Sequence, residues 1–357
     1  MGYRRAPLFI LALYNLKILL TMKKSPSSVF YIAYVCPKVD LVSLCHLERT
    51  QRASTTTEDT PLHVESTITC TSYVQNNDMP QGSYQFFVFS NESPMARAYL
   101  DVVRDTVCGL TLRTQERAYS SDNQSRPMDI SERIKGLDWP LTGITMIGQR
   151  RLINIEWAIR FVIANGVMGD FIECGVWRGG SSVFARAVLK ALNNNDRHVW
   201  LADSFQGLPK ARTSNDNDNW SKMEYLKVSL EEVQTNFRSF HLLDDRVHFC
   251  KGYFVDSLPR CNVSRIAVLR MDGDMYESTM DQLFNLYSKL EIGGVIIIDD
   301  YSIAECFRAI VDFRNWHNIT EEILSIPGDE TGRCWIKRKS IQLQKDQYLR
   351  LLPTTKS

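Results

Sequence analysis

The stretch that decides the fold of this chain is Gly169-Asp-Phe-Ile-Glu173-Cys-Gly175-Val-Trp-Arg-Gly179-Gly180-Ser181. It begins with a short apolar segment typical of a buried strand, and residues 182–192 behind it carry apolar side chains at helical spacing. The glycines let the backbone turn tightly, and the first helical turn offers free N–H groups to a ligand. The spacing E-x-G-x-x-x-G-G is not the G-x-G-x-x-G of dinucleotide-binding proteins, so no phosphate is required. A plain helix-starting turn has the same pattern, and this stretch alone leaves both interpretations open.

Strands and helices alternate in the sequence on both sides of this turn. Strands are predicted at residues 170–174, 198–202, 247–250, 266–271, 295–298, 322–326 and 334–337. Helices are predicted at 96–110, 182–192, 229–242, 279–290 and 304–316, and another helix ends near Gly166. Ser278 and Asp281 have the spacing of a capping box at the start of the helix 279–290. The alternation predicts an α/β fold, in which a mainly parallel sheet is covered by helices on both faces.

The composition of the chain changes along its length. Residues 1–94 hold an apolar start at 8–20 and then a Thr- and Ser-rich passage, so we expect a poorly structured N-terminal extension there. Residues 95–340 carry the alternating pattern and are expected to form one domain, followed by a frayed polar tail at 341–357. The apolar start is interrupted by Asn15 and Lys17 and is too short to span a bilayer. A cytoplasmic protein is therefore expected, with membrane association or secretion as the lesser alternative.

Charge and cysteine usage narrow the class of protein further. Lys and Arg total 42 against 41 Asp and Glu, and this balance gives no basic field for a nucleic-acid partner. The hydrophobic share of 44% is enough to build a globular core. The nine cysteines are odd in number and include no C-x-x-C pair. They predict buried, reduced thiols in place of a disulfide framework or a zinc site.

The residues that follow each predicted strand are the place to look for function, because parallel sheets bind ligands beyond the carboxyl ends of their strands. After the second strand, Asp203 begins the run Asp203-Ser-Phe-Gln-Gly-Leu-Pro209 and could accept hydrogen bonds from two ribose hydroxyls. The same geometry serves nucleotides and S-adenosylmethionine, and a simple turn or helix-capping aspartate is the alternative. After the third strand, Lys251-Gly252-Tyr253-Phe254 could line an adenine pocket.

Acidic residues follow the fourth and fifth strands. The fourth ends in Met271-Asp272-Gly273-Asp274-Met275, and the fifth in Asp299-Asp300. On adjacent strands, three uncompensated carboxylates would repel one another, so a cation must neutralise them or their pKa values must rise. An all-oxygen ligand set without a His or Cys cluster favours Mg²⁺ over zinc. The alternative is that these acids cap loops in solvent.

Taken together, these motifs resemble the macrocin O-methyltransferase family. The resemblance rests on the glycine turn, on Asp203-Ser-Phe-Gln-Gly-Leu-Pro209, on Met271-Asp-Gly-Asp-Met-Tyr-Glu-Ser-Thr279 and on Ile298-Asp-Asp-Tyr301. Two earlier segments, Asp138-Trp-Pro140 and Thr145-Met-Ile-Gly148, resemble the family's N-terminal element. The resemblance covers about residues 95–338 and includes no part of the first 94 residues.

The resemblance implies a class I methyltransferase fold, with a Rossmann-like sheet of seven strands whose last strand is antiparallel. It also implies S-adenosylmethionine as the methyl donor and a Mg²⁺ ion held by Asp272, Asp299 and Asp300. Metal-dependent catechol-type relatives carry a lysine three residues after the first metal aspartate, where this chain has Met275, so Asp272 becomes the expected general base. The residues implied for the donor site are Thr145 and Met146, which would close over it, and Glu173, Gly175, Gly179, Gly180, Ser181, Asp203, Ser204 and Gly252.

The resulting hypothesis is a Mg²⁺-dependent O-methyltransferase acting on a small-molecule hydroxyl. Sugar, macrolide or other polyketide, and phenolic hydroxyls all remain open as acceptors, and the Asn- and Asp-rich loop 210–222 is expected to form part of the acceptor pocket. A catalytically silent, methyltransferase-like binding protein is one alternative, and a nicotinamide-dependent oxidoreductase is another. The missing G-x-G-x-x-G speaks against the oxidoreductase. No nucleic-acid or membrane partner is expected, and a homo-oligomer is compatible with the sequence.

Overall fold

The computed structural model describes residues 92–111, 117–119 and 125–351, together with strands at 30–35, 41–47, 68–74 and 86–88. The chain forms two compact units, residues 1–92 and residues 93–357. In the first unit the strands β1 (Phe30–Val35), β2 (Leu41–Leu47), β3 (Ile68–Val74) and β4 (Phe86–Val88) form an antiparallel sheet in that order. The composition predicts a poorly structured extension here, whereas these segments form strands. The aromatic and β-branched residues of segments such as FYIAYV and ITCTSYV favour strands.

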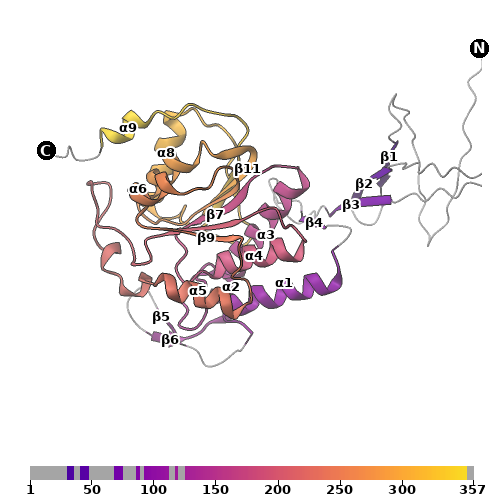
Figure 1. Ribbon diagram of the computed structural model, residues 1–357, viewed down its shortest axis with the longest axis horizontal. Coiled ribbons are helices and arrows are strands. Elements are labelled where there is room, and N and C mark those ends of the chain that lie inside the picture. Colours follow the sequence, from indigo (N-terminus) through magenta and orange to yellow (C-terminus); the bar gives the residue numbers. More distant parts are fainter. Residues whose placement is uncertain are drawn as a thin grey trace, which may run out of the picture. The chain divides into compact units, whose positions relative to one another are not determined.

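A seven-stranded sheet organises the second unit (Figure 1). Five strands are parallel: β7 (Asp170–Cys174), β8 (Val199–Asp203), β9 (Val247–Lys251), β10 (Ile266–Met271) and β11 (Leu290–Ile298). The edge next to β11 is closed by β13 (Arg333–Ile336), which is antiparallel to both β11 and β12 (Leu324–Ser325). The order β12-β13-β11-β10-β7-β8-β9 therefore confirms the predicted fold class, a Rossmann-like sheet of seven strands with an antiparallel strand at one side.

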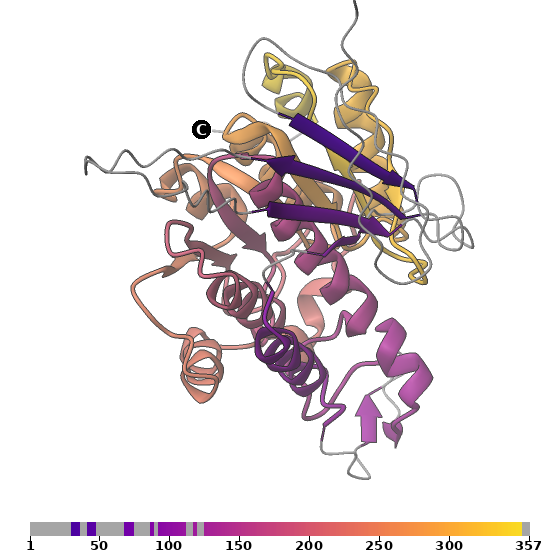
Figure 2. The ribbon, with the colours of Figure 1, turned by 90° about the vertical axis from the view of Figure 1, so that its right-hand side faces the viewer.

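Helices lie on both faces of this sheet, as Figures 1 and 2 show. One group holds α1 (Pro94–Val107), α2 (Ile130–Lys135), α3 (Gly148–Ala164), α4 (Gly180–Ala191) and α5 (Leu230–Ser239). The other holds α6 (Phe254–Ser257), α7 (Tyr276–Leu286), α8 (Ala304–Trp316) and α9 (Lys345–Leu349). A small hairpin of β5 (Arg117–Tyr119) and β6 (Ser125–Pro127) precedes α2. Because helices cover both faces, the central strands are mainly apolar, and every residue of β10 is buried, including Arg270.

The start of α7 differs from the sequence prediction. The helix begins at Tyr276, so Ser278 lies inside it and does not form the predicted capping box with Asp281. The cap comes from the loop after β8: the carboxylate of Asp216 accepts hydrogen bonds from the backbone N–H groups of Tyr276 (2.7 Å) and Glu277 (2.9 Å). A cap donated from a segment sixty residues away leaves no local sequence signature.

The C-terminal tail and one pair of cysteines also differ from the predictions. Residues 345–349 form α9, and Tyr348 is only 1% exposed, so this part of the tail is packed and not frayed. Cys250 and Cys261 form a disulfide with a Cα–Cα distance of 5.6 Å, which corrects the expectation of reduced thiols for these two residues. The chain turns back between these two cysteines, and their spacing in the sequence did not predict the bond between them. The described free cysteines, all buried as expected, are Cys108, Cys174, Cys306 and Cys334.

Within the residues that the structure describes, none of the helices has the length and apolar character needed to cross a bilayer. The apolar stretch 8–20 lies outside the described residues.

Candidate active site

The glycine turn after β7 brings three strand ends together. Gly175 has φ +84°, and a Cβ atom at this position would lie 1.7 Å from the backbone oxygen of Asp272. The N–H of Gly175 donates to the oxygen of Ala202 (2.9 Å), and the N–H of Asp272 donates to the oxygen of Cys174 (2.9 Å). Only glycine combines this backbone conformation with so close an approach. The turn therefore fixes Asp272, at the end of β10, next to the ends of β7 and β8.

Glu173 stabilises the turn from inside the protein. Its fully buried carboxylate accepts hydrogen bonds from the hydroxyls of Ser181 and Ser182 at the start of α4, and it pairs with Arg270 of β10. Burial raises the pKa of Glu173, and the positive charge of Arg270 opposes that rise. Glu173 and Ser181 therefore connect strand, helix and sheet behind the turn and do not line the cavity in front of it.

A cavity of about 980 Å³, counted with the space open to solvent at its mouth, lies at the carboxyl ends of the parallel strands. Of the predicted site residues, those lining it are Met146, Gly175, Asp203, Ser204 and Asp272. The predicted residues outside its lining are Thr145, Glu173, Gly179, Gly180, Ser181, Gly252, Asp299 and Asp300.

Asp203 holds the wall of the cavity together. Its carboxylate accepts hydrogen bonds from the backbone N–H groups of Val176 (2.8 Å) and Phe205 (2.7 Å), which belong to the turns after β7 and β8. Burial raises its pKa, and these hydrogen bonds oppose the rise. Hydrogen bonds from the Trp177 backbone and the Ser204 hydroxyl also oppose this rise in pKa. The Ser204 hydroxyl lies 3.4 Å from Oδ1 of Asp203 and 2.6 Å from the oxygen of Gly207.

Three carboxylates meet beside this cavity, but they are not the three that the resemblance implied. Oxygens of Asp272, Asp274 and Asp300 lie within 4.8 Å of one another. Burial and the nearby charge of Asp299 raise the pKa of Asp272 to about 7. Burial and neighbouring carboxylates also raise the pKa values of Asp274 and Asp300 well above the ordinary aspartate range. Such mutual repulsion is the electrostatic signature of a site that a cation would stabilise.

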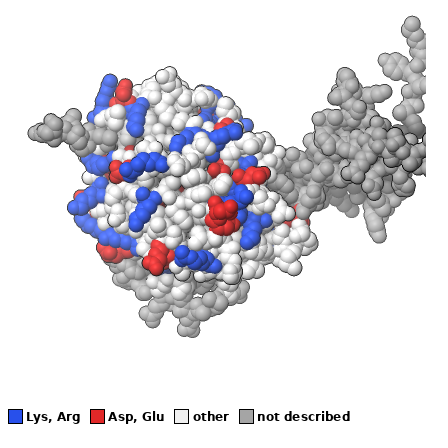
Figure 3. Space-filling view, in the orientation of Figure 1, with Lys and Arg blue, Asp and Glu red and all other residues white. Residues whose placement is uncertain are grey.

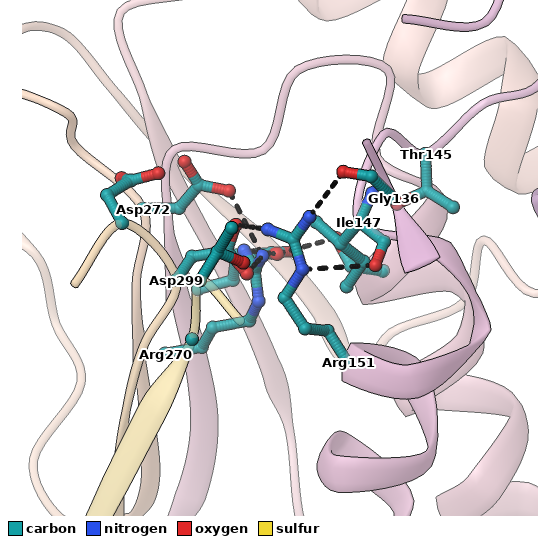
Figure 4. Close-up of polar contacts among 12 residues, drawn as sticks. Gly136, Thr145, Ile147, Arg151, Arg270, Asp272 and Asp299 are labelled. Atoms are coloured by element: carbon teal, nitrogen blue, oxygen red, sulfur yellow. Dashed lines mark hydrogen bonds and ion pairs between the residues drawn. The ribbon is translucent and has the colours of Figure 1, made fainter. Parts of the chain in front are cut away.

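Asp299 is engaged by two arginines instead (Figure 4). One carboxylate oxygen pairs with Arg151 of α3 and the other with Arg270 of β10. The strand-end carboxylates were expected to lack positively charged partners, and the side chains of Arg151 and Arg270 correct that expectation. Arg270 also reaches Asp272, with 3.0 Å between Nη2 and Oδ2. Asp299 thus joins a buried ion-pair network beside the carboxylate group, with both oxygens already occupied.

Arg151 connects this network to the segment that precedes α3 (Figure 4). Its guanidinium donates to the backbone oxygens of Ile147 (3.1 Å) and Gly136 (2.9 Å) while it pairs with Asp299. Met146, one residue before Ile147, lines the cavity. The arginine therefore holds the segment with Thr145 and Met146 against the ends of the central strands, where that segment can cover a ligand.

Several cavity residues were not among the predicted site residues. Trp177, Tyr253 and Phe254 add aromatic surface to the cavity, and the last two belong to the segment expected to line an adenine pocket. Arg212 belongs to the loop 210–222 that was expected at the acceptor pocket, whereas Asp281, inside a helix, was not predicted. On the molecular face drawn in Figure 3, acidic and basic side chains are interspersed.

A Rossmann-like seven-stranded sheet with a glycine turn after its first parallel strand, and a cavity at the carboxyl ends of the strands, defines a class I methyltransferase. The chain belongs to the macrocin-O-methyltransferase (TylF) family, whose sequence pattern matches residues 91–337. This family relationship confirms the predicted resemblance.

The relatives are named O-methyltransferases. The chain is 42% identical over 245 residues, 66% of its length and 91% of the relative's, to the 8-demethyl-8-(2,3-dimethoxy-alpha-L-rhamnosyl)-tetracenomycin-C 4'-O-methyltransferase of Streptomyces olivaceus. It is 42% identical over 246 residues, 66% of its length and 95% of the relative's, to the mycinamicin III 3''-O-methyltransferase of Micromonospora griseorubida. The solved structure of the O-methyltransferase NovP is 39% identical, with a TM-score of 0.64, covering 68% of this chain and all of NovP. The protein is an S-adenosylmethionine-dependent O-methyltransferase.

Proposed function

We propose that this enzyme methylates a hydroxyl of a sugar-bearing natural product, and that it does so with a divalent cation, Mg²⁺, at the strand-end carboxylates. The names of the two relatives specify 4'- and 3''-hydroxyl positions, and the first describes a rhamnosyl compound. The observation that carries the proposal is the pair of carboxylates of Asp272 and Asp274 on the cavity wall, next to the glycine turn.

The donor is assigned to the half of the cavity over β7, β8 and β9. Gly175 lines the cavity and has no side chain, and Asp203 ends β8 on the cavity wall, where an acid can bind ribose hydroxyls. Tyr253 and Phe254 offer aromatic surface for an adenine ring, and Met146 covers the site from the segment before α3. Glu173, Gly179, Gly180, Ser181 and Gly252 support this half from behind the wall.

The donor set fits a hard divalent cation. Mg²⁺ prefers carboxylate oxygens, and its charge would relieve the repulsion that raises the pKa values of these aspartates. We assign Asp272 and Asp300 as ligands because both the family resemblance and the geometry support them. Asp274 is placed to complete the set. Asp299 could join only by releasing Arg151 or Arg270. When bound, such an ion lowers the pKa of a coordinated hydroxyl.

The chemical step is a displacement at the methyl carbon. A lone pair of the acceptor oxygen forms the new C–O bond, and the C–S bond of the sulfonium breaks with its electrons remaining on sulfur. The hydroxyl proton goes to Asp272, the expected general base, which lies on the cavity wall. Met275 occupies the position where catechol-type relatives carry a lysine, so no lysine at that position competes for this role. The chain's contribution is mainly to position the two reactants.

The function is tested with purified enzyme, S-adenosylmethionine and mycinamicin III, followed by mass spectrometry. The expected result is an acceptor heavier by one CH₂ unit, formed with Mg²⁺ and lost with EDTA. Asp300→Asn should reduce turnover at least about a hundredfold, as loss of a metal ligand commonly does, while S-adenosylmethionine binding measured by calorimetry stays within about twofold.

The control is Asp245→Asn, because Asp245 is an exposed aspartate remote from the cavity lining. Turnover that persists in EDTA and in Asp300→Asn would reject the cation and leave methyl transfer standing. Failure to bind S-adenosylmethionine would reject the assignment of the donor site.

A further inference from the structure

The C-terminal helix α9 lies beyond the segment that matches the family, which ends at residue 337. It nevertheless packs into the second unit. The ring of Tyr348 is 1% exposed and stacks on Phe284 of α7, with centroids 5.5 Å apart and planes 5° from parallel. An exposed tail would not place an aromatic ring there, so α9 is part of the folded domain.

The hydroxyl of Tyr348 meets a charged group on the cavity wall. It donates to Oδ1 of Asp281 (3.0 Å) and accepts from Nη2 of Arg212 (3.0 Å). The same Arg212 nitrogen donates to Oδ2 of Asp281 (2.6 Å), which closes a three-membered ring of hydrogen bonds. Both Arg212 and Asp281 line the cavity. The C-terminal helix therefore contacts the cavity wall through this one hydroxyl.

Arg212 belongs to the loop of residues 207–226, which begins after β8 and crosses to the far half of the sheet. Its N–H and its guanidinium both bind Glu277 of α7, at 2.9 Å and 2.8 Å. Asp216 caps α7, and Asn217 donates to Glu305 of α8 (3.2 Å). Because α7 and α8 follow β10 and β11, the loop spans the cavity on the side away from the donor half.

We propose that Tyr348 is a positioning residue for the acceptor. Through Arg212 and Asp281 it holds the loop 207–226 in the conformation that forms the acceptor wall, so that this chain uses a segment outside the family pattern to shape its acceptor site. The inference rests on the proposed function, which identifies this wall as the acceptor side of the cavity. Leu208, Pro209 and Lys210 are the loop residues that this arrangement presents to the acceptor.

The test is Tyr348→Phe, which keeps the stacked ring and removes only the hydroxyl. With mycinamicin III as acceptor, the KM should rise about three- to tenfold, the effect of one lost hydrogen bond, while kcat and S-adenosylmethionine affinity stay within about twofold. The matched control is Tyr287→Phe, a buried tyrosine at the C-terminal end of α7 whose ring packs 5.4 Å from that of Phe313. The control should leave all three quantities unchanged.

A second readout does not depend on activity. Hydrogen exchange of the backbone amides in residues 207–226 should be faster in Tyr348→Phe than in wild type, with no change in the glycine turn after β7. If wild type fails to methylate mycinamicin III, this exchange experiment still decides whether Tyr348 holds the loop. Unchanged exchange, or a donor affinity that falls together with the acceptor KM effect, would overturn the proposal.

Discussion

At the scale of single residues, two arginines explain how the carboxylates of Glu173, Asp272 and Asp299 can lie close together. Arg270 is 1% exposed and bridges Glu173, Asp272 and Asp299 across the ends of β7, β10 and β11. The sequence identified the acids because they follow apolar strands, but it could not identify their partners. Arg270 is hidden inside an apolar strand, and Arg151 lies 148 residues from Asp299. Pairing over such separations depends on the fold and has no local pattern.

Arg270 is expected to be essential for stability. Arg270→Met would leave Glu173 and Asp299 buried with less compensation, and breaking a buried ion pair by removing one partner costs about 3–5 kcal/mol. The free energy of unfolding in urea measures this loss. Arg265→Met is the control, since Arg265 forms an exposed pair with Glu291 just before the same strand, and its effect should be small. Equal effects of the two substitutions would contradict the importance of the network.

Arg151 should affect donor binding more than stability. Arg151→Lys keeps the positive charge beside Asp299 but cannot hold both backbone oxygens of Gly136 and Ile147. S-adenosylmethionine should therefore bind at least about tenfold more weakly in calorimetry, the effect of one lost charged hydrogen bond. Arg160→Lys on the same helix disturbs a buried pair with Glu156 away from the cavity and should bind the donor normally. Equal weakening in both variants would count against a role for the segment before α3.

At the scale of elements, the apolar strands were predictable and the irregular connections were not. The predicted ranges 170–174, 266–271 and 304–316 match β7, β10 and α8 residue for residue. These elements are set by their own hydrophobic pattern. The start of α7, the disulfide and α9 are set by contacts between distant segments, so hydrophobic periodicity carried no signal for them. Within the site, the strand-end residues Asp203 and Asp272 were predicted and line the cavity, and Arg212 was predicted only as part of the loop 210–222. Asp281, inside a helix, was missed.

The cap of α7 tests whether a contact with a distant segment or a local sequence pattern stabilises the start of this helix. Asp216→Ala removes the acceptor of the first two helical N–H groups and should lower the free energy of unfolding by about 1 kcal/mol, as loss of a helix cap does. Ser278→Ala serves as the comparison, because Ser278 was the predicted cap and lies inside the helix. Thermal and urea unfolding of both variants show whether Asp216 or Ser278 caps the helix. A larger loss in Ser278→Ala would restore the sequence-based capping box.

At the scale of the whole molecule, all residues assigned to donor, cation and acceptor lie in the unit 93–357. The family pattern begins at residue 91, two residues before the N-cap of α1, whose Ser93 hydroxyl accepts from the N–H of Ala96 (3.1 Å). Helix α1 packs on α4, and its buried residues Leu100, Val103 and Val107 complete the layer over the sheet. The chemistry is therefore carried by a unit with its own core and its own N-terminal cap.

A chain that starts at residue 91 is expected to fold and to bind the donor without residues 1–90. Its S-adenosylmethionine affinity should stay within about twofold of the full chain, because no donor contact is removed. A chain that starts at residue 109, lacking α1, is the contrast: it would expose the apolar surface that Leu100, Val103 and Val107 cover, and it should lose cooperative unfolding. Calorimetry and circular dichroism on both chains measure these outcomes. A tenfold loss of donor affinity in the chain from residue 91 would mean that the first unit contributes to the donor site, and the boundary of the catalytic unit would then have to move toward the N-terminus.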